Sequence, residues 1–210
     1  MATQIKICGL STPEAIDVAV DAGATHIGLN LYEPSPRYIP LDRAKELAEY
    51  ARGRIKTVLL LVNADAELTT SALTEVRPDV VQFHGSETPE WVDLVREKVG
   101  IETWKAVGLR DAGTLERCAK FTGNVDRLLF DAPAKALPGG TGETFAWDLL
   151  AGYQHQVDWA LAGGLTPENV ATAIHQTGAP KVDTSSGVES AAGVKDMDLI
   201  RAFCKAAQNA

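Results

Sequence analysis

A cysteine near the start of the chain occupies a position that is suited to chemistry. Residues 4–8 are predicted to form a short strand, and side chains alternate along a strand, so Lys6 and Cys8 share one face. Ser11 and Glu14, just beyond it, have the spacing of a capping box at a helix start. In a parallel α/β protein, the active site lies at the edge of the sheet where the strands end and the chain continues into the helices. A small buried apolar residue is the alternative interpretation of Cys8.

Two carboxyl groups and an imidazole also stand at predicted strand ends. Asp131 closes the apolar run 128–130, and Asp183 lies near the end of another strand. A carboxylate at such a place is costly to bury unless it is paired or used. We favour a functional role for Asp131, whereas Asp183 fits a helix cap or a structural ion pair equally well. His84 shares a strand face with Gln82 and is either a substrate contact or a simple hydrogen-bonding residue.

A fixed guanidinium group is expected in the loop after the second strand. Arg37 stands in the motif Ser35-Pro36-Arg37-Tyr38, and the prolines at 34 and 36 stiffen this loop. A held guanidinium suits a bidentate grip on a planar carboxylate. The alternative is a solvated surface arginine.

Glycine-rich turns late in the chain are candidates for phosphate binding. Gly163-Gly164-Leu165-Thr166 is expected to open a helix, and Ser185-Ser186-Gly187 follows the last strand. Glycines let backbone N–H groups approach an anion closely, and a helix N-terminus adds partial positive charge. Ordinary turn chemistry is the alternative. A third turn, Gly139-Gly140-Thr141-Gly142, is interpreted as a lid, and Glu143 beside it would repel a phosphate.

Strand and helix patterns alternate along the whole sequence. Strands are predicted at residues 4–8, 26–31, 56–62, 80–83, 103–107, 127–131, 158–162 and 181–184. Helices are predicted at residues 13–22, 42–51, 66–76, 89–99, 167–176 and 197–207. The tripeptide Thr-Pro-Glu occurs at residues 12–14, 88–90 and 166–168, each time soon after a strand, and is a favourable helix opening. The predicted fold class is therefore α/β, a single (β/α)8 TIM barrel with eight parallel strands over residues 1–210.

An open, doubly wound sheet is the competing architecture. It normally places a Gly-x-Gly-x-x-Gly turn after the first strand, but only Gly9 stands there. Late glycine-rich turns agree better with the phosphate site of a barrel. The sixth unit is the weakest, because residues 148–152 are short for a helix.

Composition limits the classes of partner. The chain has 210 residues, 45% of them hydrophobic and 23% charged, which is ordinary for one globular domain. The net charge of −8 and the pI of about 5.0 argue against a nucleic-acid partner. Three cysteines at unrelated spacings suggest neither a disulfide framework nor a zinc site. With no signal peptide or membrane-length apolar run in the sequence, we expect a cytoplasmic protein that is a monomer or a homodimer.

Taken in order, several motifs resemble the phosphoribosylanthranilate isomerase family of the tryptophan pathway. Each motif is weak alone, but the ordered set is specific and covers essentially the whole chain. Four of them are Lys6-Ile7-Cys8-Gly9-Leu10, Ser35-Pro36-Arg37-Tyr38, Val81-Gln82-Phe83-His84-Gly85 and Leu129-Phe130-Asp131. The others are Gly139-Gly140-Thr141-Gly142 with Phe145 and Trp147, Leu161-Ala162-Gly163-Gly164-Leu165 and Val182-Asp183-Thr184-Ser185-Ser186-Gly187-Val188-Glu189. Thr184, Phe83, Glu143 and Ala146 depart from the commoner family pattern.

The resemblance implies a role for each candidate residue. Cys8 would be the general base, Asp131 the general acid, and Arg37 the group that holds the anthranilate carboxylate. The turns at Gly163-Gly164 and Ser185-Ser186-Gly187 would hold the ribose phosphate, with Asp183 as a supporting carboxylate. The implied reaction is an Amadori rearrangement that needs no metal or organic cofactor. It requires Asp131 to stay protonated near neutral pH, which burial would favour, and Cys8 to ionise, for which Lys6 is a candidate neighbouring cation.

Two other functions stay open at this point. One is a different sugar-phosphate barrel, such as a ribulose-phosphate epimerase or a Schiff-base aldolase. An aldolase needs a nucleophilic lysine on a strand, and Lys105 is the one tempting position besides Lys6. The other is a barrel that binds a phosphorylated metabolite without turnover, against which the pair of Cys8 and Asp131 speaks.

Overall fold

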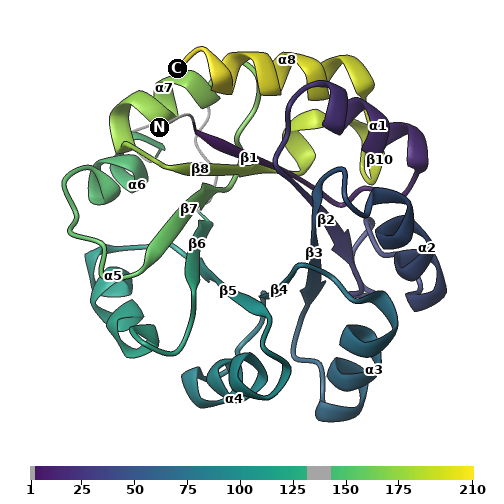
Figure 1. Cartoon of the computed structure of the whole chain (residues 1–210). Coiled ribbons are helices and arrows are strands. Elements are labelled where there is room, and N and C mark those ends of the chain that lie inside the picture. The colour runs from purple at the N-terminus through teal and green to yellow at the C-terminus, as the bar shows by residue number, and fades with distance from the viewer. Residues whose placement is uncertain (1–2, 132–142) are drawn as a thin grey trace.

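Eight parallel strands close into a barrel in the computed structural model, which describes residues 3–131 and 143–210 (Figure 1). The strands follow one another around the ring in chain order, and β8 pairs with β1 to close it. Their bounds are β1 Gln4–Cys8, β2 His26–Asn30, β3 Lys56–Leu61, β4 Val80–Phe83, β5 Glu102–Gly108, β6 Arg127–Asp131, β7 Asp158–Ala162 and β8 Lys181–Thr184. The predicted (β/α)8 barrel is confirmed, and the open sheet is excluded.

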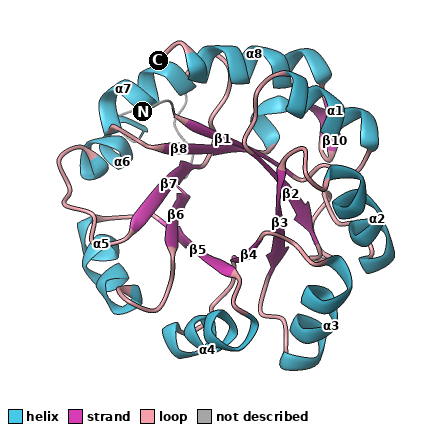
Figure 2. Ribbon diagram, viewed as in Figure 1, coloured by secondary structure: helices cyan, strands magenta, loops and turns pink. Residues whose placement is uncertain are grey.

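Helices surround this ring of strands (Figure 2). Their bounds are α1 Pro13–Asp21, α2 Leu41–Ala51, α3 Ala66–Val76, α4 Pro89–Val99, α5 Ala112–Cys118, α6 Glu143–Leu150, α7 Val170–Thr177 and α8 Met197–Gln208. Short 3-10 helices, η1 Ala119–Phe121 and η2 Ser186–Val188, and a hairpin of β9 Glu189–Ala191 and β10 Val194–Lys195 complete the described elements. Within the described residues, every helix falls short of the length and apolar character that a membrane-spanning helix requires.

The structure decides three details of the predicted helices. The Thr12 cap expected from the Thr-Pro-Glu pattern is confirmed, because its side chain accepts a hydrogen bond from Ala15 N, and the Ser11 cap is wrong. The helix expected from residue 167 begins at Val170, since Asn169 folds its side chain back onto the preceding turn. The sixth helix runs over Glu143–Leu150, earlier than the weak segment at residues 148–152.

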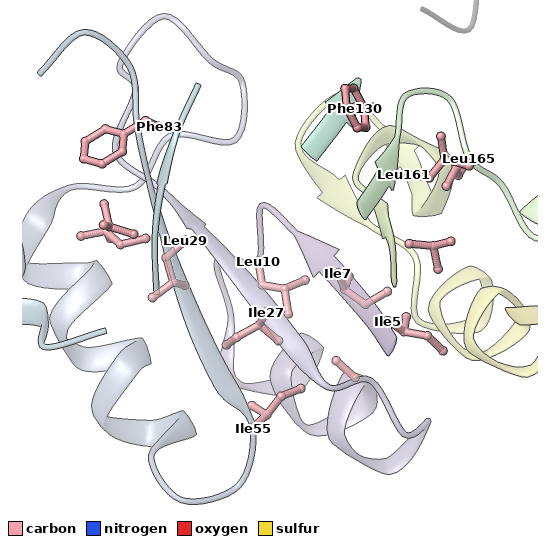
Figure 3. Close-up of a cluster of buried hydrophobic side chains, with 14 of the residues drawn as sticks. Ile5, Ile7, Leu10, Ile27, Leu29, Ile55, Phe83, Phe130, Leu161 and Leu165 are labelled. Carbon is pink, nitrogen blue, oxygen red and sulfur yellow. The ribbon is translucent and has the colours of Figure 1, made fainter. Parts of the chain in front are cut away.

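The main hydrophobic core lies between the strands and the helices. Figure 3 shows Ile5 and Ile7 of β1 beside Ile27 and Leu29 of β2, in a cluster of buried apolar side chains. All four are at most 1% exposed. Burial of this kind contributes about 25 cal/mol per Å² of apolar surface, so the core holds the strand ends in fixed positions.

The inside of the barrel is filled in layers, because every second strand residue points inward. The middle layer is mostly apolar and includes Val58, Val80, Trp104 and Leu129, all fully buried. Nearer the carboxyl end, polar residues such as Gln82 and Asp131 take the corresponding inward positions beside apolar ones such as Leu60 and Ala162. Nearer the amino end, several of the corresponding residues are charged, as at Lys56, Glu102 and Arg127. The fold thus presents two different polar surfaces at its two ends.

Candidate active site

A cavity of about 550 Å³ opens at the carboxyl ends of the strands, and we call it the mouth cavity. All the residues proposed from the sequence line it. They are Cys8, Arg37, His84, Asp131, Gly163, Gly164, Asp183, Ser185, Ser186 and Gly187. They come from β1, β6, β8 and the loops after β2, β4, β7 and β8, so the barrel brings together residues that are far apart in the chain.

Cys8 is buried at the base of this cavity, with 6% of its surface exposed. Gly28 lies opposite it on β2, where a Cβ atom would come within 2.6 Å of the Cys8 Sγ, so a larger residue would displace the thiol. Burial raises the pKa of Cys8, while the cations of Lys6 and Lys195 act in the opposite direction. The expected help from Lys6 is therefore present, but in the free protein it is outweighed by burial.

Lys6 and Asp183 form a buried ion pair, with 2.9 Å between Nζ and Oδ2. Although burial opposes its charge, Asp183 and Cys8 together raise the pKa of Lys6, so the lysine stays charged. The two residues are directly opposite in the β1–β8 ladder, which accounts for the pairing. Asp183 Oδ1 is buried and accepts no hydrogen bond from the described residues.

Asp131 lies on the other side of the mouth, at the end of β6. Its Oδ2 is 3.5 Å from His84 Nε2, and His84 Nδ1 is 3.2 Å from Gln82 Nε2. These contacts orient the imidazole towards the carboxyl group. The burial that we expected for Asp131 is absent, because 40% of its side-chain surface is exposed. A bound substrate would have to supply that burial.

Arg37 is held by a partner that the sequence did not reveal. Its Nε and Nη2 donate to the two carboxylate oxygens of Glu189, at 2.7 Å each. Lys195 Nζ donates to Glu189 Oε1 at 2.6 Å. Although burial opposes its charge, these cations lower the pKa of Glu189 to about 2. Three of the five guanidinium N–H groups remain for a ligand, so Arg37 is fixed in place and still able to bind an anion.

The loops after β7 and β8 form a cradle of backbone groups. Gly163 and Gly164 both have positive φ, at 93° and 62°, and their N–H groups bond to none of the described residues. Gly187 packs so closely on the carbonyl of Leu165 that a Cβ atom would clash with it. Thr184 Oγ1 also donates to Leu165 O at 2.7 Å, which ties the two loops together. The proposed lid at residues 139–142 lies outside the described residues.

Other residues around the mouth escaped the sequence reasoning. Asn30 Nδ2 donates to Ser35 Oγ at 3.1 Å, and Ser35 Oγ accepts from Arg37 N at 3.1 Å, so this network shapes the arginine loop. The prolines that stiffen the loop around Arg37 were the sequence signal that could have pointed to this network. Lys105 does not line the mouth cavity, since its Nζ is bonded to Gly85 O and Ala106 O at 2.8 Å and paired with Glu87. This placement removes the Schiff-base candidate at Lys105.

The fold and the cavity define a class of protein, namely a (β/α)8 barrel whose polar site lies at the carboxyl ends of its strands. Comparisons with known proteins then give the family. The profile described as N-(5'phosphoribosyl)anthranilate (PRA) isomerase matches residues 5–206. The chain belongs to this family of enzymes, as its motifs suggested.

Individual relatives agree with this assignment. An N-(5'-phosphoribosyl)anthranilate isomerase from Erythrobacter litoralis is 61% identical over 208 residues, covering 99% of this chain and all of the relative. The crystal structure of phosphoribosyl anthranilate isomerase from Thermotoga maritima is similar with a TM-score of 0.89, at 33% identity over 99% of this chain and all of that one. Another such isomerase was solved in complex with reduced 1-(o-carboxyphenylamino)-1-deoxyribulose 5-phosphate. It has a TM-score of 0.87 and 31% identity over 99% of this chain and all of that one.

Proposed function

We propose that this chain catalyses the Amadori rearrangement of N-(5-phosphoribosyl)anthranilate to 1-(2-carboxyphenylamino)-1-deoxyribulose 5-phosphate, a step of tryptophan biosynthesis. The observation that carries the proposal is the position of Cys8 and Asp131, which line one cavity from strands that are not neighbours in the barrel. An isomerisation of this kind needs two proton-transferring groups on different sides of a sugar.

The backbone cradle of Gly163, Gly164, Ser186 and Gly187 would bind the phosphate of the substrate. Backbone N–H groups and the start of the short helix η2 favour a negative charge there. Arg37 would bind the anthranilate carboxylate with the N–H groups that Glu189 leaves free. These two contacts fix the sugar between them, and a fixed geometry of this kind lowers the entropic part of the barrier.

Asp131 would act first, as a general acid. It gives its proton to the ring oxygen of the furanose, the bond from carbon 1 to that oxygen breaks, and the nitrogen lone pair forms a protonated Schiff base. The substrate would cover the exposed part of the carboxyl group, which favours the protonated form before the transfer. His84 would orient the carboxyl group through its Nε2.

Cys8 would then act as the general base. Its thiolate takes the proton from carbon 2, the electron pair forms a double bond to carbon 1, and the iminium electrons return to nitrogen. The resulting enol loses its hydroxyl proton and gains a proton at carbon 1, which gives the ketone, and exchange with solvent resets both side chains. Because burial raises the pKa of Cys8, we expect kcat/KM to rise with pH as the thiol ionises.

The fluorescence of the anthranilate group provides the test, since its signal changes on isomerisation. We expect turnover by the purified protein and a kcat lower by about 10²–10⁴-fold in Cys8→Ser, the usual cost of losing a general base. Cys118→Ser is the matched control, because Cys118 is also a buried thiol but does not line the mouth cavity. Full turnover by Cys8→Ser would remove the assignment of the base, and an inactive wild-type protein would overturn the proposed reaction.

A further inference from the structure

A second polar cavity lies at the opposite end of the barrel, where the strands begin. It has a volume of about 310 Å³ and shares no lining residue with the mouth cavity. We call it the floor cavity, and it is lined by Gln4, Thr25, His26, Lys56, Glu102, Arg127 and Lys181. The proposed isomerisation uses none of these side chains.

Positive charge predominates in the floor cavity. Lys56, Arg127 and Lys181 supply three cations, and Glu102 supplies the one carboxylate among the lining residues. Glu102 Oε1 accepts a hydrogen bond from the indole N–H of Trp104 at 2.7 Å, so this carboxylate is already engaged. Arg127 has its ion-pair contacts at the edge of the cavity, at 3.9 Å to Glu102 and 3.4 Å to the exposed Asp158.

Lys181 is the unusual member of this set, because its ammonium group is buried beside neutral groups. It is 1% exposed, and its Nζ lies 4.0 Å from the centre of the Trp104 ring and 3.1 Å from His26 Nε2. In the part of the chain that the structure describes, no carboxylate forms an ion pair with it. A buried cation without a counter-ion is costly to maintain.

His26 is arranged to accept a hydrogen bond from Lys181 and not to supply negative charge. Thr25 Oγ1 donates to Ile5 O at 2.9 Å and accepts from Ile5 N at 3.1 Å, which leaves one lone pair to accept the Nδ1–H of His26 at 2.8 Å. His26 Nε2 is then the acceptor for the Lys181 ammonium. Burial and the surrounding cations lower the pKa of His26 to about 2, which keeps the ring neutral.

Arg127 adds a second unused donor. Its Nε is buried and has no hydrogen-bond partner among residues 3–131 and 143–210. A buried donor left unpaired costs free energy, which a ligand acceptor would recover.

We propose that the floor cavity is a binding site for a small oxyanion of the sulfate or phosphate type, held by Lys181 and Arg127 with Lys56 at the rim. The anion would supply the negative charge that Lys181 lacks and an acceptor for Arg127. The volume also leaves room for a small organic group on a phosphate. Such a site is separate from the cradle at the mouth and needs no chemistry from it.

The charged groups around Lys181 make this binding depend on pH. Burial and the cations of Arg127, Lys56 and Lys6, opposed by Glu102, lower the pKa of Lys181 to about 7. His26 stays neutral, whereas Lys181 titrates near neutral pH. A bound anion requires the ammonium form, and binding should weaken about tenfold for each pH unit above the pKa of Lys181.

Sulfate is the probe, because its charge is constant between pH 6 and pH 9, and the reporter is the indole N–H signal of Trp104 in a proton–nitrogen correlation spectrum. We expect sulfate to shift this signal saturably at pH 6 against sodium chloride of equal ionic strength. Lys181→Met and Arg127→Met should each weaken the binding by about 10- to 100-fold, as expected for a lost charge-assisted hydrogen bond. Lys45→Met removes the same charge from the exposed face of α2 and should leave the affinity unchanged.

The two ends of the barrel are distinguished in the same spectra. Sulfate at the mouth would shift the amide signals of Gly164 and Gly187 but not the indole of Trp104. If sulfate shifts only the mouth signals, the proposal is overturned. The same holds if Lys45→Met weakens binding as much as Lys181→Met, or if the affinity is the same at pH 6 and pH 9. Because Arg127→Met tests the site independently, failure of one variant to fold does not remove the test.

Discussion

The two ends of this barrel hold buried charge in different ways. At the mouth, each buried lysine has a carboxylate within reach: Lys6 pairs with Asp183 at 2.9 Å and Lys195 with Glu189 at 2.6 Å. At the floor, the buried Lys181 forms no ion pair with any described residue and lies against an imidazole and an aromatic ring. Paired charges orient neighbouring groups, as Glu189 orients Arg37. A buried cation without a counter-ion, in contrast, can still attract an anionic ligand. The comparison shows that the burial of a lysine does not by itself reveal the role of that lysine.

The strongest test of the difference between the two ends is to remove one carboxyl group from each of them. Asp131→Asn should lower kcat by about 10²–10⁴-fold, because an amide cannot give a proton to the leaving ring oxygen. Asp158→Asn changes a carboxyl group at the floor end of β7 and should leave kcat unchanged. Steady-state turnover by fluorescence measures both. Equal losses in the two variants would mean that activity reports only the integrity of the barrel.

Stability should also differ between the two ends. Lys6→Met leaves the buried Asp183 without its partner and should lower the free energy of unfolding by about 3–5 kcal/mol. Lys181→Met replaces a buried cation that has no carboxylate and should leave this free energy unchanged or raise it. Urea unfolding at pH 7 in a buffer free of sulfate and phosphate measures both values. A loss for Lys181→Met as large as that for Lys6→Met would contradict the contrast.

Substitution of Arg37 distinguishes an effect on substrate binding from an effect on the chemical step at the mouth. Arg37→Ala should raise KM by about 10- to 100-fold, the loss of a charge-assisted bond, with a smaller change in kcat. A guanidinium that grips the carboxylate binds the ground state and the transition state alike. Glu189→Gln weakens the hold on Arg37 and should raise KM less. An unchanged KM in Arg37→Ala would show that this side chain serves only to pair Glu189.

Over a single pH unit, the pH dependence of stability gives the smallest effect. Lys181 has a pKa of about 7 in the folded protein, below its value of 10.5 in the unfolded chain. Between these values the unfolded state binds the extra proton, so the destabilisation present below pH 7 is relieved as the pH rises. Its contribution should increase the free energy of unfolding by at most about 1.4 kcal/mol per pH unit. Subtracting the unfolding free energy of Lys181→Met from that of the wild-type protein at each pH isolates this contribution. Parallel pH profiles of the two proteins would contradict it.

Most of the fold could be predicted because it depends on local patterns. The strand runs are short and apolar, and the helix openings at residues 12–14 and 88–90 carry their caps as expected. The third copy, at residues 166–168, forms a turn and not the first turn of a helix. There the amide group of Asn169 bonds to Thr166 N and Gly164 O, which shapes the loop for the backbone cradle. A tertiary requirement of the loop thus overrides the local preference.

The position of the site could be predicted where a residue stands at a strand end or in the loop that follows. Cys8, Asp131 and Asp183 were placed at the mouth in this way, because parallel strands collect their carboxyl ends at one place. The partner of Arg37 could not be found, since Glu189 is 152 residues away and no periodicity links the two. The floor cavity was missed for a similar reason. Lys181 begins its strand as an ordinary polar residue, and only the closed barrel brings His26 and Trp104 against it.

The central claim is that the mouth, and not the floor, holds the reacting sugar between Cys8 and Asp131. A crystal structure of this protein with reduced 1-(o-carboxyphenylamino)-1-deoxyribulose 5-phosphate tests it most directly. We expect the phosphate on the backbone of Gly164 and Gly187, the carboxylate on Arg37, and the sugar chain within hydrogen-bond reach of both Cys8 and Asp131, about 3.2 Å or one bridging water. A ligand that binds in the mouth with both side chains out of that reach, or that occupies the floor cavity, would contradict the claim.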